Sequence, residues 1–193
     1  GLPQITLATG TPAVVDYTSG STTTDLTFNY TVSASHTATD LDYVSTAALA
    51  LNTGTITDLA GNTATLTLPA PGASGSLGNN KSIGVDSTAP TATTTTGQPT
   101  GTSATTTLTI TVAGADVTHY KHKVGDSSSI NCSVTAGYSA ETPIATLITD
   151  DISGITNGNT ARLCVIGRDA AGNWQTEASA YSVTWTKDTT TPT

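Results

Sequence analysis

Two nearly identical five-residue segments, DLAGN at 58–62 and DAAGN at 169–173, recur in the same setting along this chain of 193 residues. Each is followed by a strand-like stretch and then by a linker containing Asp, Thr and Pro, VDSTAPT (85–91) and KDTTTPT (187–193). The two copies are roughly 100 residues apart, which is about the size of one β-sandwich domain. The repeat therefore predicts two similar domains in tandem, joined near residues 86–90.

The strand-like stretches show the two-residue period of pleated strands. LTFNYTV (26–32) places its apolar residues on one face and its polar residues on the other. The same alternation occurs at 64–68, 108–112, 161–167 and 181–185. Only STAALALN (45–52) is a candidate for a short helical turn. The pattern predicts an all-β chain of two tandem β-sandwich domains, 1–89 and 90–193.

Composition supports strands and excludes several classes of partner. The chain is rich in threonine, whose β-branched side chain suits pleated strands better than helices. With 14 acidic and 6 basic residues the net charge is −8, so no basic face for nucleic acid or an anionic membrane is expected. No run of about 18 apolar residues occurs, so no membrane insertion is expected. An acidic surface favours cations such as calcium.

The two cysteines, Cys132 and Cys164, are either free core thiols or a disulfide. Cys132 lies in the polar stretch SSINCSVTAGY, where a buried free thiol is unfavourable. We therefore expect a disulfide and an oxidising compartment. Closing a loop of this length contributes on the order of 3 kcal/mol in the chain-entropy model.

Three segments of the first half, DLDY (40–43), GTITDLAGN (54–62) and NKSIGVDSTAP (80–90), resemble the bacterial immunoglobulin-like repeats of large secreted and surface proteins. The second half is similar to another Ig-like or fibronectin-III-like repeat, with DAAGNWQ at 169–175. The resemblance implies two tandem Ig-like β-sandwich domains in an extracellular stalk, fibre or adhesin at the bacterial cell surface, with neighbouring repeats of the same chain as partners. It implies no enzymatic activity.

One departure from the family pattern concerns the start of the chain. Repeats similar to the first half carry two more strands before a segment like GLPQITL (1–7). The first domain is therefore expected to lack its first strands, or to receive a strand from another chain. An unpaired sandwich edge tends to pair with other molecules.

The D-x-A-G-N segments have two interpretations, a tight turn or part of a calcium site. Asp accepts backbone N–H groups, Gly allows positive φ and Asn tolerates the left-handed region, which together explain a turn without a ligand. Calcium takes six to eight oxygen ligands. The candidate ligands in the first domain are Asp40, Asp42, Asp58, Asn62 and Asp86, and those in the second are Asp150, Asp151, Asp169, Asn173 and Asp188.

Other candidate sites are weaker. His119 and His122 are three apart in HYKHK (119–123), so they face opposite sides of a strand, and we interpret the segment as a solvated strand edge. The lysines, including those in HYKHK, are expected to be exposed or in linkers. No nucleophile, phosphate-loop or metalloprotease motif occurs, which argues against an enzyme. Trp185 is expected in the core, and Trp174 either caps one end of the sandwich or offers a platform for a sugar.

The sequence therefore predicts a non-catalytic structural module that provides spacing and surface attachment. The alternative is a binding module that recognises a glycan or a protein through loops at one end of a sandwich.

Overall fold

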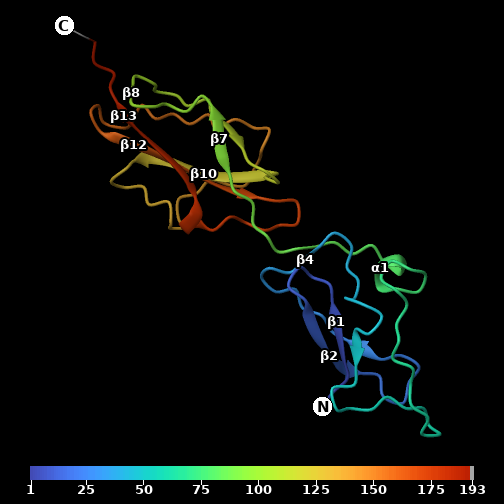
Figure 1. The fold of residues 1–193 in the computed structure, drawn as a ribbon. Helices are drawn as coiled ribbons and strands as arrows, with labels where there is room; N and C mark the ends of the chain where they lie inside the picture. Colours follow the sequence, from blue (N-terminus) through green and yellow to red (C-terminus); the bar gives the residue numbers. More distant parts are fainter. Residues whose placement is uncertain (192–193) are drawn as a thin grey trace. The chain divides into compact units, whose positions relative to one another are not determined.

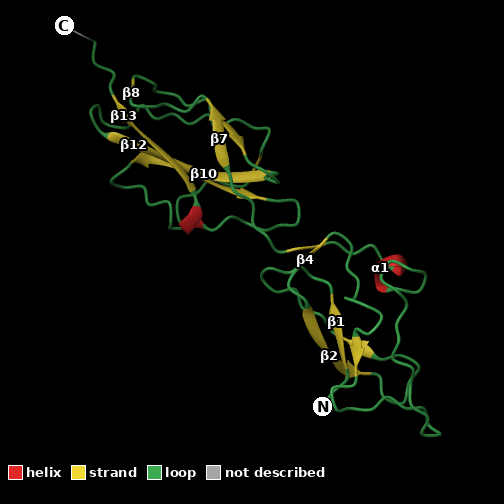
Figure 2. Ribbon diagram, in the orientation of Figure 1, coloured by secondary structure: helices red, strands yellow, loops and turns green. Residues whose placement is uncertain are grey.

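The computed structural model describes residues 1–191, and the chain divides into two compact units, Gly1–Thr88 (unit 1) and Ala89–Thr193 (unit 2). Both units consist of strands joined by loops and turns, as Figures 1 and 2 show. The described helical elements are α1 (Leu77–Asn80) in unit 1 and the 3-10 helix η1 (Glu177–Ser179) in unit 2. The prediction of an all-β chain is thus confirmed.

Unit 1 is built on a four-stranded antiparallel sheet. Its order is β3 (Thr27–Phe28), β2 (Ala13–Ser19), β1 (Gln4–Leu7), β5 (Leu49–Ala50). A second pair joins β4 (Thr37–Ala38) to β6 (Val85–Asp86). The sequence of β2, AVVDYTS, alternates as a half-buried strand should: Ala13 and Val15 are buried, whereas Val14 is exposed.

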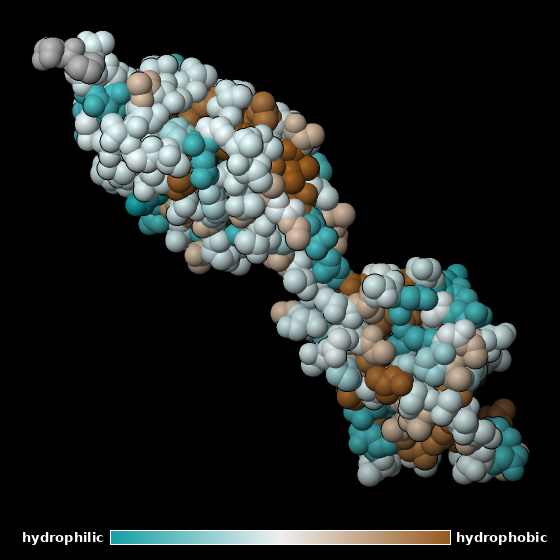
Figure 3. Space-filling view, turned by 45° about the horizontal axis from the view of Figure 1, so that its top comes forward, coloured by the Kyte–Doolittle hydropathy of each residue, from teal (hydrophilic) through white to brown (hydrophobic). Residues whose placement is uncertain are grey.

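The core of unit 1 is small. Its buried apolar residues are Leu7, Ala13, Val15, Leu41, Tyr43, Ala48 and Val85. Many apolar side chains of the unit stay outside this core, and Leu59 is fully exposed at 101%. Figure 3 shows the brown apolar residues as scattered patches on a mostly polar surface. Unit 1 thus buries little apolar area for its length.

Unit 2 is built on a five-stranded sheet. Its order is β11 (Thr142–Pro143), β10 (His119–Asp126), β12 (Thr160–Arg168), β13 (Tyr181–Lys187), β8 (Thr102–Ser103). The first four are antiparallel neighbours, and β8 pairs parallel with β13. A separate pair joins β7 (Thr93–Thr96) to β9 (Thr111–Ala113). Isolated bridges link Thr107 to Asp151 and Ile110 to Ile148.

The core of unit 2 lies between these two sets of strands. Leu108, Ile110 and Val112 come from the side of β9, and Tyr120, Leu163, Val165 and Trp185 come from the five-stranded sheet. Trp185 is 2% exposed, and Tyr181 and Val183 of the same strand pack against the same cluster. The predicted core position of Trp185 is confirmed.

The local predictions of strands and helical turns were confirmed at some segments and wrong at others. The strands predicted at 161–167 and 181–185 are confirmed as β12 and β13. The predicted strand at 26–32 is reduced to Thr27–Phe28, and no assigned strand covers 64–68. The helical turn proposed at 45–52 is wrong, because this segment is a turn leading into β5. The short helix lies instead at 77–80, where the Ser76 hydroxyl accepts the Asn79 N–H.

The interpretation of HYKHK as a strand edge is also wrong. The segment lies in β10, between β11 and β12, because the long apolar strand β12 pairs with it over eight residues. Lys123 and Lys187 are buried, with only 6% and 3% of their surface exposed, which corrects the expectation that the lysines are exposed or in linkers. No helix within residues 1–191 is long and apolar enough to cross a membrane.

Candidate functional site

The DLAGN segment forms a closed turn in unit 1. The Asp58 carboxylate accepts the backbone N–H groups of Ala60 at 2.9 Å and Asn62 at 2.8 Å, and the Asn62 side-chain amide at 2.8 Å. The Asp58 N–H donates to the Asn62 carbonyl at 3.0 Å. Gly61 has φ of 87°, a value that favours glycine. The residues of this pentamer are exposed to solvent.

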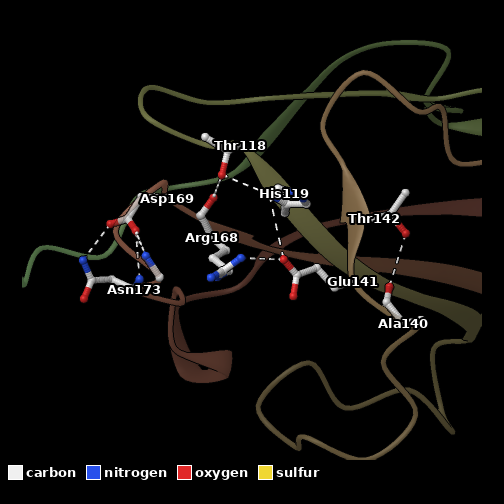
Figure 4. A network of polar contacts seen from close by, with 9 residues as sticks. Thr118, His119, Ala140, Glu141, Thr142, Arg168, Asp169 and Asn173 are labelled. Carbon is white, nitrogen blue, oxygen red and sulfur yellow. Dashed lines mark hydrogen bonds and ion pairs between the residues drawn. The ribbon is translucent and has the colours of Figure 1, made fainter.

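The DAAGN segment forms a similar turn in unit 2, as Figure 4 shows. The Asp169 carboxylate accepts the N–H groups of Gly172 at 2.7 Å and Asn173 at 2.8 Å, and the Asn173 side-chain amide at 2.8 Å. The Asp169 N–H donates to the Asn173 carbonyl at 3.1 Å, and Gly172 has φ of 102°. Asp169, however, is only 3% exposed.

These hydrogen bonds change the acidity of both carboxyl groups. The Asn62 side chain and backbone amides hold the pKa of Asp58 below its usual value. For Asp169 burial acts to raise the pKa, but the hydrogen bonds from Asn173 and its neighbours outweigh burial, so its pKa is also lowered. Both carboxylates are therefore ionised at neutral pH and act as acceptors for the turn.

The turn of unit 2 is held by residues on both sides of it. Before it, Arg168 donates from Nη1 to Glu141 at 2.7 Å, and the Arg168 carbonyl accepts the Thr118 N–H at 2.8 Å. His119 Nδ1 lies 3.8 Å from the same Glu141 carboxylate. Figure 4 shows this row of contacts running from the turn toward β11. The surroundings of the turn are thus polar and connected.

Gln175, two residues after the turn, is a buried latch that sequence reasoning missed. Its Oε1 accepts the N–H groups of Ala92 at 2.9 Å and Gly167 at 3.2 Å. Its Nε2 donates to the Ser179 carbonyl at 2.6 Å. The side chain thus ties the beginning of unit 2 to β12 and η1. The segment DAAGNWQ carries this signal, whereas the corresponding position of unit 1 is Ala64.

Trp174 is half-buried, and Lys121 Nζ lies 4.5 Å from the centre of its ring. A cation over an aromatic face contributes about 0.5–1 kcal/mol at an exposed site. This ring face is therefore already used within the unit, which disfavours Trp174 as a sugar platform.

The acidic residues of DLDY anchor a loop. Asp42 is buried and accepts the N–H groups of Tyr43 and Gly72, both at 2.9 Å. Gly78 of α1 lies between Asp40 and Asp42, since a Cβ there would meet both carboxylates, at 3.4 Å and 3.0 Å. Burial raises the pKa of Asp42, but the hydrogen bonds from Gly72 and Tyr43 prevail, so the pKa is lowered.

The remaining candidate ligands lie in separate turns. The carboxylates of Asp86, Asp151 and Asp188 each accept the N–H group two residues later, from Thr88, Ser153 and Thr190. Asp150 binds His122, with 2.8 Å between Oδ2 and Nε2.

Within residues 1–191, no group of three or more His, Cys, Asp or Glu residues lies close enough to hold a metal ion. The oxygens of Asp58 and Asp169 are oriented by N–H donors, a surrounding that suits a turn and gives a cation few free ligands. Calcium binding stays a prediction.

His119 and His122 point to different neighbours, as expected for residues three apart in a strand. His122 also lies 3.3 Å from the Ser139 hydroxyl, so serine, histidine and aspartate form a row. The Ser139 hydroxyl also donates to the Ala140 carbonyl and accepts the backbone N–H of His122. This row therefore connects β10 with two loops of unit 2.

The predicted disulfide between Cys132 and Cys164 is confirmed. Cys164 lies on β12 and is fully buried, and Cys132 lies in the segment between β10 and β11. Because Leu163 and Val165 point into the core, Cys164 lies on the opposite face of the sheet. The disulfide thus holds a surface segment against the outer face of unit 2.

No family model, curated protein or solved structure matches this chain.

Proposed function

We propose that the chain is a non-catalytic structural module, two tandem Ig-like β-sandwich domains of an extracellular fibre, stalk or adhesin at the bacterial cell surface. In this role it spaces and attaches other parts of its parent chain. The observation that carries the proposal is the strand order of unit 2. Its five-stranded sheet, ending in a parallel β13–β8 pair, faces the strands around β9 across one core, an arrangement typical of a sandwich.

The parallel β8–β13 pair supports a role under tension. β8 lies near the start of unit 2 and β13 at its end, so pulling on the two ends loads their shared hydrogen bonds in shear. These bonds include Thr186 N–H to Gly101 O at 2.8 Å and Asp188 N–H to Ser103 O at 2.9 Å. In unit 1 the first strand β1 pairs with β2 and β5, and the last strand β6 pairs with β4. Unit 2 is therefore the stronger element under load.

The disulfide supports the proposed location. Disulfides persist in oxidising compartments outside the cytosol. The low content of charged residues, and hydroxyl groups that bond within their own turns, such as those of Thr23 and Ser128, are compatible with a static module. Neighbouring repeats of the same chain are the proposed partners.

Stretching single molecules of the tandem chain tests the mechanical role. We expect two unfolding steps, with unit 2 yielding at the higher force. Reduction should lengthen the extension of unit 2 by about 11 nm, because the 32-residue separation between the cysteines is then released at about 3.6 Å per residue. Equal forces for the two units would contradict the proposed role of the β8–β13 pair.

The location has its own test. An antibody against the chain should label intact, unpermeabilised source cells, and the label should disappear after external protease treatment. Labelling only after permeabilisation would contradict an extracellular module.

A second function, binding a glycan or a protein through loops at one end of a sandwich, is favoured by a hollow in unit 1. The hollow has a volume of about 1220 Å³ and lies beside the DLAGN turn. Leu2, Leu26, Leu59, Tyr17 and the hydroxyl residues at 21–24 line it. Tight, saturable binding on a glycan array that is lost in Leu26→Asp would favour this function over the spacer.

Calcium remains a proposal with a simple test. Thermal melting of the tandem chain with and without chelator should show a lower melting temperature in chelator if an ion stabilises either unit. An unchanged melting temperature would reject a structural ion.

A further inference from the structure

Residues 127–140, which lie between β10 and β11, cover the outer face of the sheet of unit 2 and are called the flap below. It has no regular strand, yet it is fixed at several points. The disulfide joins Cys132 to Cys164, and Arg162 donates to the Ile130 carbonyl at 3.0 Å. The Tyr138 hydroxyl donates to the Cys132 carbonyl at 2.9 Å, which closes the flap on itself.

Lys123 lies under the flap. It is the cross-strand partner of Cys164, so both side chains project from the same outer face. Its Nζ donates to the carbonyls of Val134 at 2.5 Å and Ala136 at 3.2 Å, and it lies 4.3 Å from the centre of the Tyr138 ring. The flap therefore closes directly over a lysine ammonium group.

Burying this ammonium group costs free energy. No carboxylate lies within ion-pair distance of Lys123 in the described part of the chain, and its direct partners are neutral carbonyls and a ring. Burial lowers the pKa of Lys123, and the smaller effect of the Glu177 charge acts in the opposite direction. A buried cation without a contacting anion favours states in which water reaches it.

The closed flap is therefore held by one covalent bond, the disulfide, and opposed by the free-energy cost of burying the Lys123 ammonium group. Val134 at its outer surface is 46% exposed, whereas Ile130 and Tyr138 are half-buried. Further side-chain contacts to the rest of the unit are single hydrogen bonds: the Thr135 hydroxyl donates to Glu177 at 2.9 Å, and the Ser139 hydroxyl accepts the backbone N–H of His122 at 3.1 Å. We therefore expect loss of the disulfide to shift the equilibrium from a closed flap to an open one.

We propose that the flap is a redox-gated cover, which opens when the Cys132–Cys164 disulfide is reduced and then exposes Lys123 and the outer face of β10 and β12. Two low-molecular-weight thiols supply the electrons: they leave as one disulfide, and two cysteine thiols form on the protein. The rest of unit 2 stays folded, because its core lies on the opposite face of the sheet. This device goes beyond the proposed spacer role and does not depend on it.

Amine labelling of the full chain tests the proposal, since three lysines serve as reporters. Lys81 is exposed, whereas Lys187 is buried away from the flap and donates to the carbonyls of Ile152 and Ser153 at 2.7 and 2.8 Å. Brief treatment with an N-hydroxysuccinimide ester, followed by peptide mapping, is compared before and after reduction. Labelling of Lys123 should rise at least tenfold, while that of Lys81 and Lys187 stays unchanged.

Two outcomes would overturn the gate. If Lys123 stays protected after reduction, the hydrogen bonds hold the flap without the disulfide. If Lys187 becomes labelled together with Lys123, reduction unfolds the whole unit and no separate flap exists.

The variant Lys123→Met tests whether the buried charge of Lys123 drives the opening of the flap. In Lys123→Met the flap closes over an uncharged side chain of similar length, so it should stay closed after reduction. The rate at which iodoacetamide alkylates Cys164, which is fully buried in the oxidised chain, should then be at least fivefold lower than in the reduced parent protein. Equal alkylation rates would show that Lys123 does not drive the opening.

Discussion

The two D-x-A-G-N turns share most of their internal hydrogen bonds, although the second backbone donor is Ala60 in one and Gly172 in the other, and their surroundings differ. In each, an Asp carboxylate accepts two backbone N–H groups and the Asn side-chain amide. The turn of unit 1 is exposed, and Ala64 follows it where unit 2 has Gln175. The turn of unit 2 buries Asp169 and lies between the Arg168–Glu141 ion pair and the Gln175 latch. The pentamer therefore encodes a shape, and its surroundings decide how much stability that shape contributes.

The largest expected effect is that of Asp169→Ala. Removing the carboxylate leaves the N–H groups of Gly172 and Asn173 without their acceptor, so unit 2 should lose about 3 kcal/mol of unfolding free energy. Both tryptophans, Trp174 and Trp185, lie in unit 2, so urea unfolding followed by tryptophan fluorescence reports on that unit alone.

The matched control is Asp58→Ala, which removes the same acceptor from the exposed turn of unit 1. It should leave the tryptophan transition unchanged. If both variants shift that transition equally, the units do not unfold separately and the comparison fails.

Gln175→Ala should cost unit 2 about 2 kcal/mol, because two buried N–H groups, of Ala92 and Gly167, lose their acceptor. The same urea titration measures the loss. Asn131→Ala is the control within unit 2, since the Asn131 side chain is exposed and accepts the Ser133 N–H. A loss no larger than that of the control would show that Gln175 is no latch.

Lowering the pH should reduce the stability that the Asp169 turn contributes to unit 2. The folded-state pKa of Asp169 is lowered, so its contribution is present above the unfolded pKa of about 4 and is lost as pH falls through the folded value. Asp169→Asn should therefore be less stable than the parent at pH 7, with the difference shrinking below pH 4. A difference that stays constant from pH 7 to pH 2.5 would contradict this linkage.

The smallest expected effect is that of Leu59→Ala, which makes the two pentamers identical in sequence. Leu59 is fully exposed, so the stability of unit 1 should change by less than about 0.5 kcal/mol. Hydrogen exchange of the β1 and β2 amides measures it. A large loss would mean that Leu59 packs against a surface and that the turn has a further contact.

The sequence predicted those parts of the fold that depend on residues close together in the chain. The two-residue period identified β12 and β13, and the polar setting of Cys132 predicted the disulfide. The shape of both turns follows from Asp, Gly and Asn themselves.

Features set by distant partners were missed. The burial of Lys123 depends on a flap that comes from later in the chain, and the Gln175 latch depends on Ala92, 83 residues earlier. The polar residues of HYKHK predicted a strand edge, but the segment pairs with the apolar strand β12 inside the sheet. The short strand at Thr27–Phe28 is the opposite case. The alternating pattern of 26–32 predicts a longer strand, but unit 1 offers only a small core for it to pack against.

Amide hydrogen exchange of Asn62 and Asn173, measured in one sample of the tandem chain, tests the central claim most directly. Both N–H groups donate to the Asp carboxylate of their own turn at 2.8 Å, so the local bond is the same in the two units. Exchange at Asn173 should be at least a hundredfold slower, because opening that turn requires exposing the buried Asp169 and breaking the contacts of Arg168 and Gln175 with the rest of unit 2. Equal exchange rates would contradict the claim that the surroundings set the stability of the turn.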